Sequence, residues 1–218
     1  MEQKKKRDNM FKDAIILCLI TLVLGGVLAG VYAITKKPIE EAQAKTNNEA
    51  CAAIIADGDE VNDNDEAAVS GAAAYLSTHD LSNSEVSKEA DSLAAWVTVE
   101  QVHPTKNGGS VYLVKARKGY GGDVSFALGV SAEGAITGIS ITSQSETAGL
   151  GANCENKEWQ AGFKDKVLPS NPADNMYNKE AATDSQVQAL SGATVTSRAI
   201  TNAVKGVLFY STSGKEAS

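Results

Sequence analysis

Apolar residues are concentrated near the start of the chain, where 21 positions from Ala14 to Ile34 carry no charge. A helix rises about 1.5 Å per residue, so this stretch spans roughly 30 Å, the thickness of a bilayer core. The basic residues Lys4 to Arg7 also fit a signal peptide, but the apolar stretch exceeds the roughly 7–15 residues typical of one. We therefore predict a cytoplasmic segment at 1–13 and a retained transmembrane helix at 14–34.

The flanking charges predict the orientation of this helix. Five basic residues precede it and three follow it within a short distance, namely Lys4, Lys5, Lys6, Arg7 and Lys12 before it and Lys36, Lys37 and Lys45 after it. Positive charge favours the cytoplasmic side. Everything after Lys36 is then expected outside the cytoplasm, attached to the membrane lipid through the helix.

Residues 35–92 form a predicted connecting region. Pro38 to Ala56 is rich in helix formers and predicts a stalk helix. Asp57 to Glu66 is dense in acidic and turn residues, but it lacks the alternating ligand spacing of a calcium-binding loop, so we expect a solvated loop. Ala67 to Ser92 predicts short helices and loops.

From Leu93 the pattern changes to the alternation of β-strands. Trp96–Val102 and Ser110–Ala116 flank a turn at 104–109, and Asp123–Val130 and Ala135–Thr142 flank a turn at 131–134. This predicts an antiparallel sheet of at least four strands. Apolar stripes predict two helices that cover one face of the sheet, Lys157–Leu168 and Thr196–Tyr210. The fold class is α+β, with a domain at 93–211 and a tail at 212–218.

Charge and cysteine content restrict the function further. After residue 13 the chain has 15 basic and 24 acidic residues, a net charge of about −9, so phosphate-mediated binding of nucleic acid is not expected. Cys18 lies in the apolar helix, and Cys51 and Cys154 could pair or remain free. No cysteine cluster accompanies His79 or His103, so no metal site is expected, although Cys18 could share a cluster with other subunits.

The candidate binding residues are Ser191, Gly192, Ala193 and Thr194, which stand at the start of the last predicted helix. Gly192 and Ala193 allow a phosphate to approach the backbone, and a helix start offers unpaired N–H groups. The Thr194 hydroxyl would lie beside that phosphate, where a separate transferase could join it to FMN as a phosphodiester. The alternative is a capped helix start, because Ser and Thr are favoured there.

Two further strings precede this run, Gly119–Gly122 and Glu146–Gly151. From Gly119 to Tyr210, together with the anchor, the chain resembles the FMN-binding domain shared by two subunits: the G subunit of Rnf-type ferredoxin:NAD oxidoreductases and the C subunit of sodium-translocating NADH:quinone oxidoreductases. The resemblance implies one covalent FMN per chain, on Thr194. It also implies that the second string lies against the flavin, through Glu146, Thr147, Gly149, Leu150 and Gly151.

The chain departs from the family pattern at two positions. Gln188 stands where an acidic residue usually contributes to recognition by the flavin transferase, and Ala148 stands where proline is usual. The first departure concerns recognition by the transferase and so the attachment of the flavin. The second matters less because its neighbours match.

The chain lacks the patterns of an enzyme that acts alone. It has no nucleophile and base at a recognisable spacing, no paired carboxylates and no dinucleotide fingerprint, so we assign no catalytic residues. The resemblance implies an electron relay in an Rnf-type complex, with membrane and cytoplasmic subunits and a flavin transferase as partners. The alternatives are the equivalent subunit of the NADH:quinone pump, a free-standing flavin carrier, or a membrane-anchored scaffold without a cofactor.

Overall fold

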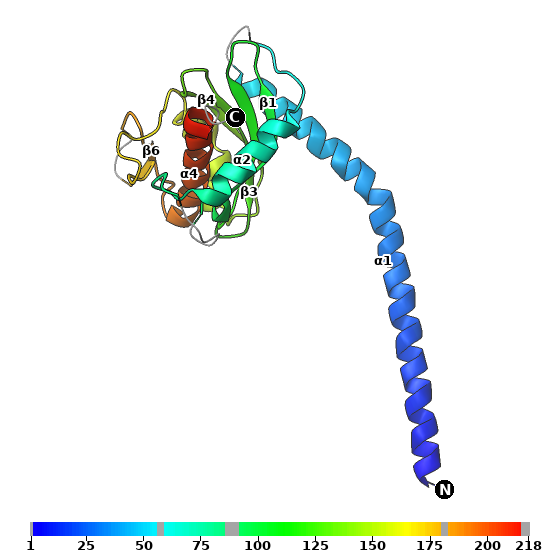
Figure 1. Ribbon diagram of the computed structural model, residues 1–218. Coiled ribbons are helices and arrows are strands. Elements are labelled where there is room, and N and C mark those ends of the chain that lie inside the picture. The colour runs from blue at the N-terminus through cyan, green and yellow to red at the C-terminus, as the bar shows by residue number, and fades with distance from the viewer. Residues whose placement is uncertain (1, 56–58, 86–91, 180–182, 215–218) are drawn as a thin grey trace. The chain divides into compact units, whose positions relative to one another are not determined.

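The computed structural model describes residues 2–55, 59–85, 92–179 and 183–214 (Figure 1). The chain divides into two compact units, Met1–Lys45 and Thr46–Ser218.

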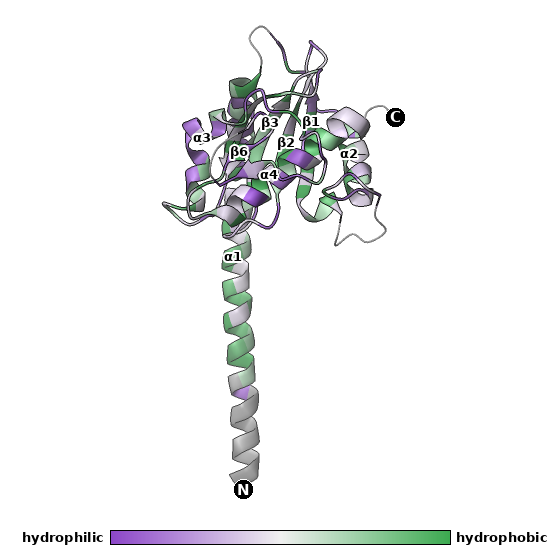
Figure 2. Ribbon diagram, turned by 90° about the vertical axis from the view of Figure 1, so that its left-hand side faces the viewer, coloured by the Kyte–Doolittle hydropathy of each residue, from purple (hydrophilic) through white to green (hydrophobic). Residues whose placement is uncertain are grey.

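The first unit consists of the greater part of helix α1, which runs from Glu2 to Ile54. Its apolar stretch, green in Figure 2, is long and apolar enough to cross a membrane, and none of it is buried in protein. A helix over the predicted span at 14–34 is therefore confirmed. The helix predicted from Pro38 is the continuation of α1, since a proline in a helix removes one backbone hydrogen bond without having to end the helix.

The second unit is built on one antiparallel sheet, as predicted. Its strands are β1 (Val97–Pro104), β2 (Ser110–Ala116), β3 (Val124–Val130) and β4 (Ile136–Ser143), in the order β1-β2-β3-β4. Each strand pairs with the next one in sequence, so short turns suffice to connect them. The α+β fold class is confirmed.

Two helices cover one face of the sheet, which we call the inner face. They are α2 (Glu66–Thr78) and α4 (Thr194–Phe209), both in front of the strands in Figure 1. The predicted apolar stripe of α4 is fully buried and contains Ile200, Val204, Val207 and Leu208. It packs in one core with the alternate strand residues Tyr112, Val114, Phe126 and Leu128. Burial of this stripe holds the start of α4 at one end of the sheet.

The outer face of the sheet is covered by the last turns of α1, which belong to the second unit. Ala50, Cys51 and Ile54 pack there against Val111, Leu113 and Ala127. The Thr137 hydroxyl donates a hydrogen bond of 2.7 Å to the carbonyl oxygen of Ile54.

The two buried cysteines lie on opposite faces of the sheet. Cys51 packs in the outer cluster, whereas Cys154 is fully buried in the inner core. Both are free thiols, as is Cys18. Of the two alternatives that the sequence left open, the free state is the one observed, because the sheet separates Cys51 from Cys154.

The helix predicted at 157–168 is wrong in length. Helix α3 covers only Lys157–Ala161, after a short 3-10 turn, η3 (Gly151–Glu155). Beyond it the backbone of Asp165 and Lys166 hydrogen-bonds to Ile136 at the start of β4, each at 2.8 Å. Pairing with the sheet replaces the helical bonds, and Asp165 takes a left-handed conformation (φ 61°) at that point. The apolar spacing predicted the packing, since Trp159 and Phe163 meet edge to face, but it did not predict where the helix ends.

The remaining elements are short. They comprise a 3-10 turn η2 (Leu93–Ala95), a two-residue parallel pair β5 (Tyr177–Asn178) and β6 (Val187–Gln188), and a π-helical turn η4 (Tyr210–Gly214). Of the predicted acidic loop, positions 57 and 58 lie outside the described residues, and Val61 forms a bridge with Thr105. Position 56 at the end of the predicted stalk and positions 215–218 of the tail also lie outside them.

Candidate functional site

The three sequence strings meet at one end of the sheet. The antiparallel register places the start of β1, the end of β2, the start of β3 and the end of β4 at this end, beside the start of α4. A cavity of about 420 Å³ lies there. It is lined by Tyr120 from the first string, by Glu146, Thr147, Leu150 and Gly151 from the second, and by Gly192 to Thr196 from the third.

The start of α4 leaves backbone donors unpaired. The helix begins at Thr194 with Ala193 as its N-cap, and no side chain caps it. Its first hydrogen bond in this turn runs from the N–H of Ser197 to the carbonyl of Ala193, at 3.0 Å. The N–H groups of Thr194, Val195 and Thr196 therefore have no intrahelical acceptor. The capping interpretation of this motif is wrong, because neither Ser191 nor Thr194 supplies the cap, and the free donors suit an anion.

The turn before α4 is shaped by a buried serine and a glycine. The Ser197 hydroxyl accepts from the N–H of Leu190 at 2.9 Å and donates to the carbonyl of Ala193 at 3.0 Å. Gly192 has φ +70°, a conformation that side-chain-bearing residues rarely adopt. Ser191 is exposed and does not line the cavity, so of the predicted Ser-Gly-Ala-Thr contacts only the last three lie at its wall.

A buried carboxylate joins the three strings. Glu146 is 8% exposed. One of its oxygens accepts from the N–H of Gly121 at 2.9 Å, and the other accepts from the Thr196 hydroxyl at 2.5 Å. No signal in the sequence indicates this pairing, because Glu146 and Thr196 are 50 positions apart, although the burial of Thr196 follows from its place one turn before Ile200 on the apolar stripe.

The two threonines in the first turn of α4 have different environments. Thr196 is 1% exposed and its hydroxyl is used by Glu146. Thr194 is partly exposed and lines the cavity. Within the described part of the chain its hydroxyl has no hydrogen-bond partner, so of the two it is the hydroxyl that a ligand can reach.

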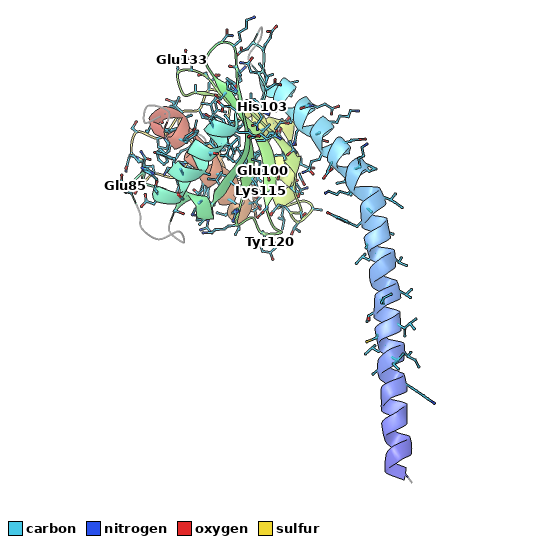
Figure 3. All side chains as sticks on the ribbon, turned by 45° about the vertical axis from the view of Figure 1, so that its right-hand side comes forward. Glu85, Glu100, His103, Lys115, Tyr120 and Glu133 are labelled. Carbon is cyan, nitrogen blue, oxygen red and sulfur yellow. The ribbon has the colours of Figure 1, made fainter. Side chains whose placement is uncertain are left out.

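Exposed apolar side chains stand around the cavity. Tyr120 is 75% exposed, Leu150 44% and Val195 38%. Tyr120 projects outward from the end of the sheet in Figure 3, opposite to the end that carries Glu133. An apolar rim beside unpaired N–H donors fits a ligand that has both a planar ring system and an anionic group.

The rest of the second string builds the loop. The Thr147 carbonyl accepts from the N–H groups of Leu150 and Ala152 at 3.1 and 3.2 Å. Gly149 turns the chain with φ +75° and, unlike the other four residues predicted from this string, does not line the cavity. Gly151 lies so close to the carboxylate that an added Cβ would be 2.5 Å from a Glu146 oxygen.

Gln188, the departure from the family pattern, is exposed six positions before Thr194. It lies in β6, where its carbonyl accepts from the indole N–H of Trp159 at 2.8 Å. The two histidines lie elsewhere: His79 stacks on Tyr75, and His103 hydrogen-bonds to the Asn62 carbonyl.

Comparison with known proteins agrees with this geometry. The model of the FMN-binding domain matches residues 119–208, and the model of the RnfG N-terminal region matches residues 1–54. The G subunit of the Na⁺-translocating ferredoxin:NAD⁺ oxidoreductase complex of Acetobacterium woodii is 30% identical over 222 residues, which cover 94% of each chain. The G subunit of the proton-translocating complex of Clostridium ljungdahlii is 28% identical over 94% of this chain and 93% of its own.

Among solved structures, NqrC of Shewanella oneidensis is 21% identical and matches with a TM-score of 0.42, covering 54% of this chain and 58% of its own.

The protein is thus an FMN-binding domain that follows one apolar N-terminal helix. It belongs to the family of G subunits of ion-translocating oxidoreductase complexes.

Proposed function

We propose that this chain is the membrane-anchored G subunit of an ion-translocating ferredoxin:NAD oxidoreductase complex, and that it relays electrons through FMN attached covalently to Thr194. One observation carries the proposal. Thr194 and Thr196 in the first turn of α4 both line the cavity, but Glu146 holds the Thr196 hydroxyl, whereas the Thr194 hydroxyl has no hydrogen-bond partner among the described residues.

The residues at the site fit FMN. A cavity of about 420 Å³ is within the range of roughly 300–1,000 Å³ that holds small ligands and cofactors. The unpaired N–H groups at the start of α4 would hold the phosphate, and Tyr120, Leu150 and Val195 would contact the apolar ring system. Bound FMN supplies the electron transfer, while the protein holds it and sets its surroundings.

We infer that a partner enzyme attaches the flavin. Glu146 is the carboxylate among the described lining residues, and its two oxygens accept hydrogen bonds from Gly121 and Thr196, so its contacts join the loops and none is made to Thr194. A flavin transferase would therefore activate the hydroxyl and supply FMN from a donor whose phosphate carries a leaving group. Such an enzyme would meet Gln188 as an exposed side chain.

The predicted topology explains why the flavin would be attached covalently. The five-to-three bias of basic residues favours a cytoplasmic N-terminus and an extracytoplasmic FMN domain. A flavin held there without a covalent bond would be lost whenever it dissociated. Because ferredoxin and NAD are cytoplasmic, electrons would cross the membrane to reach this domain and cross back, which is useful only if the crossing is coupled to ion movement.

The test is Thr194→Val in the assembled complex. We expect the fluorescent flavin band of this subunit to disappear from a denaturing gel, and we expect NAD reduction by ferredoxin and ion transport to stop together. The other subunits should still copurify. Activity near that of the wild type in an assembled complex would show that the domain is not the relay.

A further inference from the structure

Two basic side chains lie over Trp96 and a third lies nearby, against β1, at the same end of the sheet as the cavity. The Lys118 ammonium lies 4.4 Å and the Arg198 guanidinium carbon 5.8 Å from the centroid of the Trp96 ring. Arg117 donates to the Thr98 hydroxyl at 2.9 Å. The face of the Trp96 ring attracts the Lys118 and Arg198 cations electrostatically, and the Thr98 hydroxyl holds Arg117. We call Trp96, Arg117, Lys118 and Arg198 the cationic patch.

The cationic patch adjoins the site on two sides. Lys118 is two positions before Tyr120, which lines the cavity. Arg198 is one helical turn after Thr194, and helical side chains incline toward the N-terminus of their helix, so its side chain extends toward the first turn of α4. The patch therefore adjoins residues that line the cavity.

The charge of the patch is opposite to that of the domain. Residues 46–218 contain 12 basic and 22 acidic residues, a net charge of about −10. Within the described part of this unit, the ion pairs join Lys106 to Glu60 and Lys115 to Glu100. None of them neutralises a cation of the patch, so the patch is a positive area on an acidic surface.

Exposed apolar area lies at the same place. The large apolar side chains exposed in the described part of residues 46–218 are Tyr120, Leu150, Val167 and Val195. All but Val167 line the cavity. We call Tyr120, Leu150 and Val195 the apolar rim.

We propose that the cationic patch and the apolar rim together form the surface on which the domain docks an acidic face of the subunit that exchanges electrons with its flavin. This inference rests on the proposed function. A small apolar area bordered by charge suits a weak, short-lived electron-transfer contact. An acidic partner is repelled by most of the domain and attracted only here, so the same charges that bring it in also direct it to the cavity.

The test compares neutralised and control variants in the purified, assembled complex. Lys118→Gln with Arg198→Gln removes two cations of the patch. Lys106→Gln is the control for the position of the charge, since it removes one cation at the opposite end of the sheet. The intensity of the flavin band is measured first, and then the rate of reduction of the bound flavin by stopped flow over a range of salt concentrations.

We expect all variants to carry wild-type amounts of flavin. The double variant should reduce its flavin about tenfold more slowly at low salt and should lose most of the salt dependence that the wild type shows. Lys106→Gln should behave as the wild type. Lys118→Arg with Arg198→Lys keeps the charges and should restore the rate, which a defect in packing would not allow.

Three results would overturn the inference. If the double variant carries flavin and its flavin is reduced at the wild-type rate at every salt concentration, no acidic partner docks at the patch. A flavin band lost only in the double variant would show that these cations serve attachment of the flavin instead. A wild-type chain without covalent flavin would contradict the proposed function itself, and the docking inference with it.

Discussion

At the scale of single residues, the hydroxyls of Thr194 and Thr196 determine the chemistry of the site. They are two positions apart on one helix and both residues line the cavity, yet the Thr194 side chain is partly exposed whereas the Thr196 hydroxyl is bound by a buried carboxylate. A sequence motif that contains both does not distinguish them. Burial and hydrogen bonding do.

The two threonines should therefore differ in their effect on stability. Thr196→Val leaves one oxygen of the buried Glu146 carboxylate without its donor and should lower the free energy of unfolding by about 1–3 kcal/mol. Thr194→Val removes a hydroxyl that has no partner and should change it by less than about 0.5 kcal/mol. Urea unfolding of the solubilised, flavin-free chain measures both. Equal losses would show that the Glu146 contact contributes nothing to stability.

Lys205 should produce a pH dependence of stability. This residue is 3% exposed on α4, its ammonium donates to the Asp174 carbonyl at 2.9 Å, and burial lowers its pKa below the ordinary value of 10.5, against the opposing influence of Asp174 and Asp80. Between its folded pKa and 10.5 the unfolded chain binds more protons than the folded chain, so the contribution of Lys205 to stability rises with pH in this window.

The check is a comparison with Lys205→Met. The wild type should gain stability relative to this variant as the pH rises from the folded pKa of Lys205 toward 10.5. A difference that stays constant or moves the other way would show that burial does not lower the pKa of this lysine.

At the scale of elements, the loops around the cavity depend on close backbone approach. A Cβ added at Gly151 would lie 2.5 Å from a Glu146 oxygen and 2.6 Å from the Thr196 hydroxyl, whereas one added at Gly149 would meet nothing within 4 Å. Both glycines belong to one motif, but only Gly151 packs against the buried carboxylate.

Gly151→Ala should therefore separate the second string from α4. We expect it to abolish flavin attachment when the transferase is coexpressed, as judged by the fluorescent band. Gly149→Ala should keep the band and cost about 1–2 kcal/mol of stability, the penalty for its left-handed conformation. If both variants attach flavin equally well, the Glu146 contact is not needed to shape the site.

Alternation and apolar stripes were sufficient to predict β1 to β4 and α4, because their apolar residues recur with the period of a strand or a helix. They failed after Ala161, where α3 ends and the chain goes on to pair with Ile136 through Asp165 and Lys166, and at the two-residue strands β5 and β6, which are too short to show a period. At the site, the three strings were identifiable from the sequence. The contact of Glu146 with Thr196 was not, because nothing local marks a partner 50 positions away.

At the scale of the whole molecule, the proposed relay requires the FMN domain to face away from the cytoplasm. Ala132 is exposed in the turn between β3 and β4 and offers a labelling position in a chain whose Cys51 and Cys154 are buried. Burial raises the pKa of the Cys154 thiol to about 12 and also raises that of Cys51, which keeps both unreactive near neutral pH.

Ala132→Cys, combined with Cys18→Ala, should react with a membrane-impermeant maleimide in intact cells. The Cys18→Ala chain without the new cysteine is the control and should remain unlabelled. Protection of position 132 until the cells are lysed would place the domain in the cytoplasm.

The assignment of FMN to Thr194 is best tested by peptide mass spectrometry of the wild-type chain isolated from its native membrane. We predict one FMN phosphoryl group per chain, on the peptide that contains Ser191 to Arg198, with fragment ions that assign it to Thr194. Assignment to Thr196, or a fully unmodified peptide from a complex that is active, would contradict the proposal.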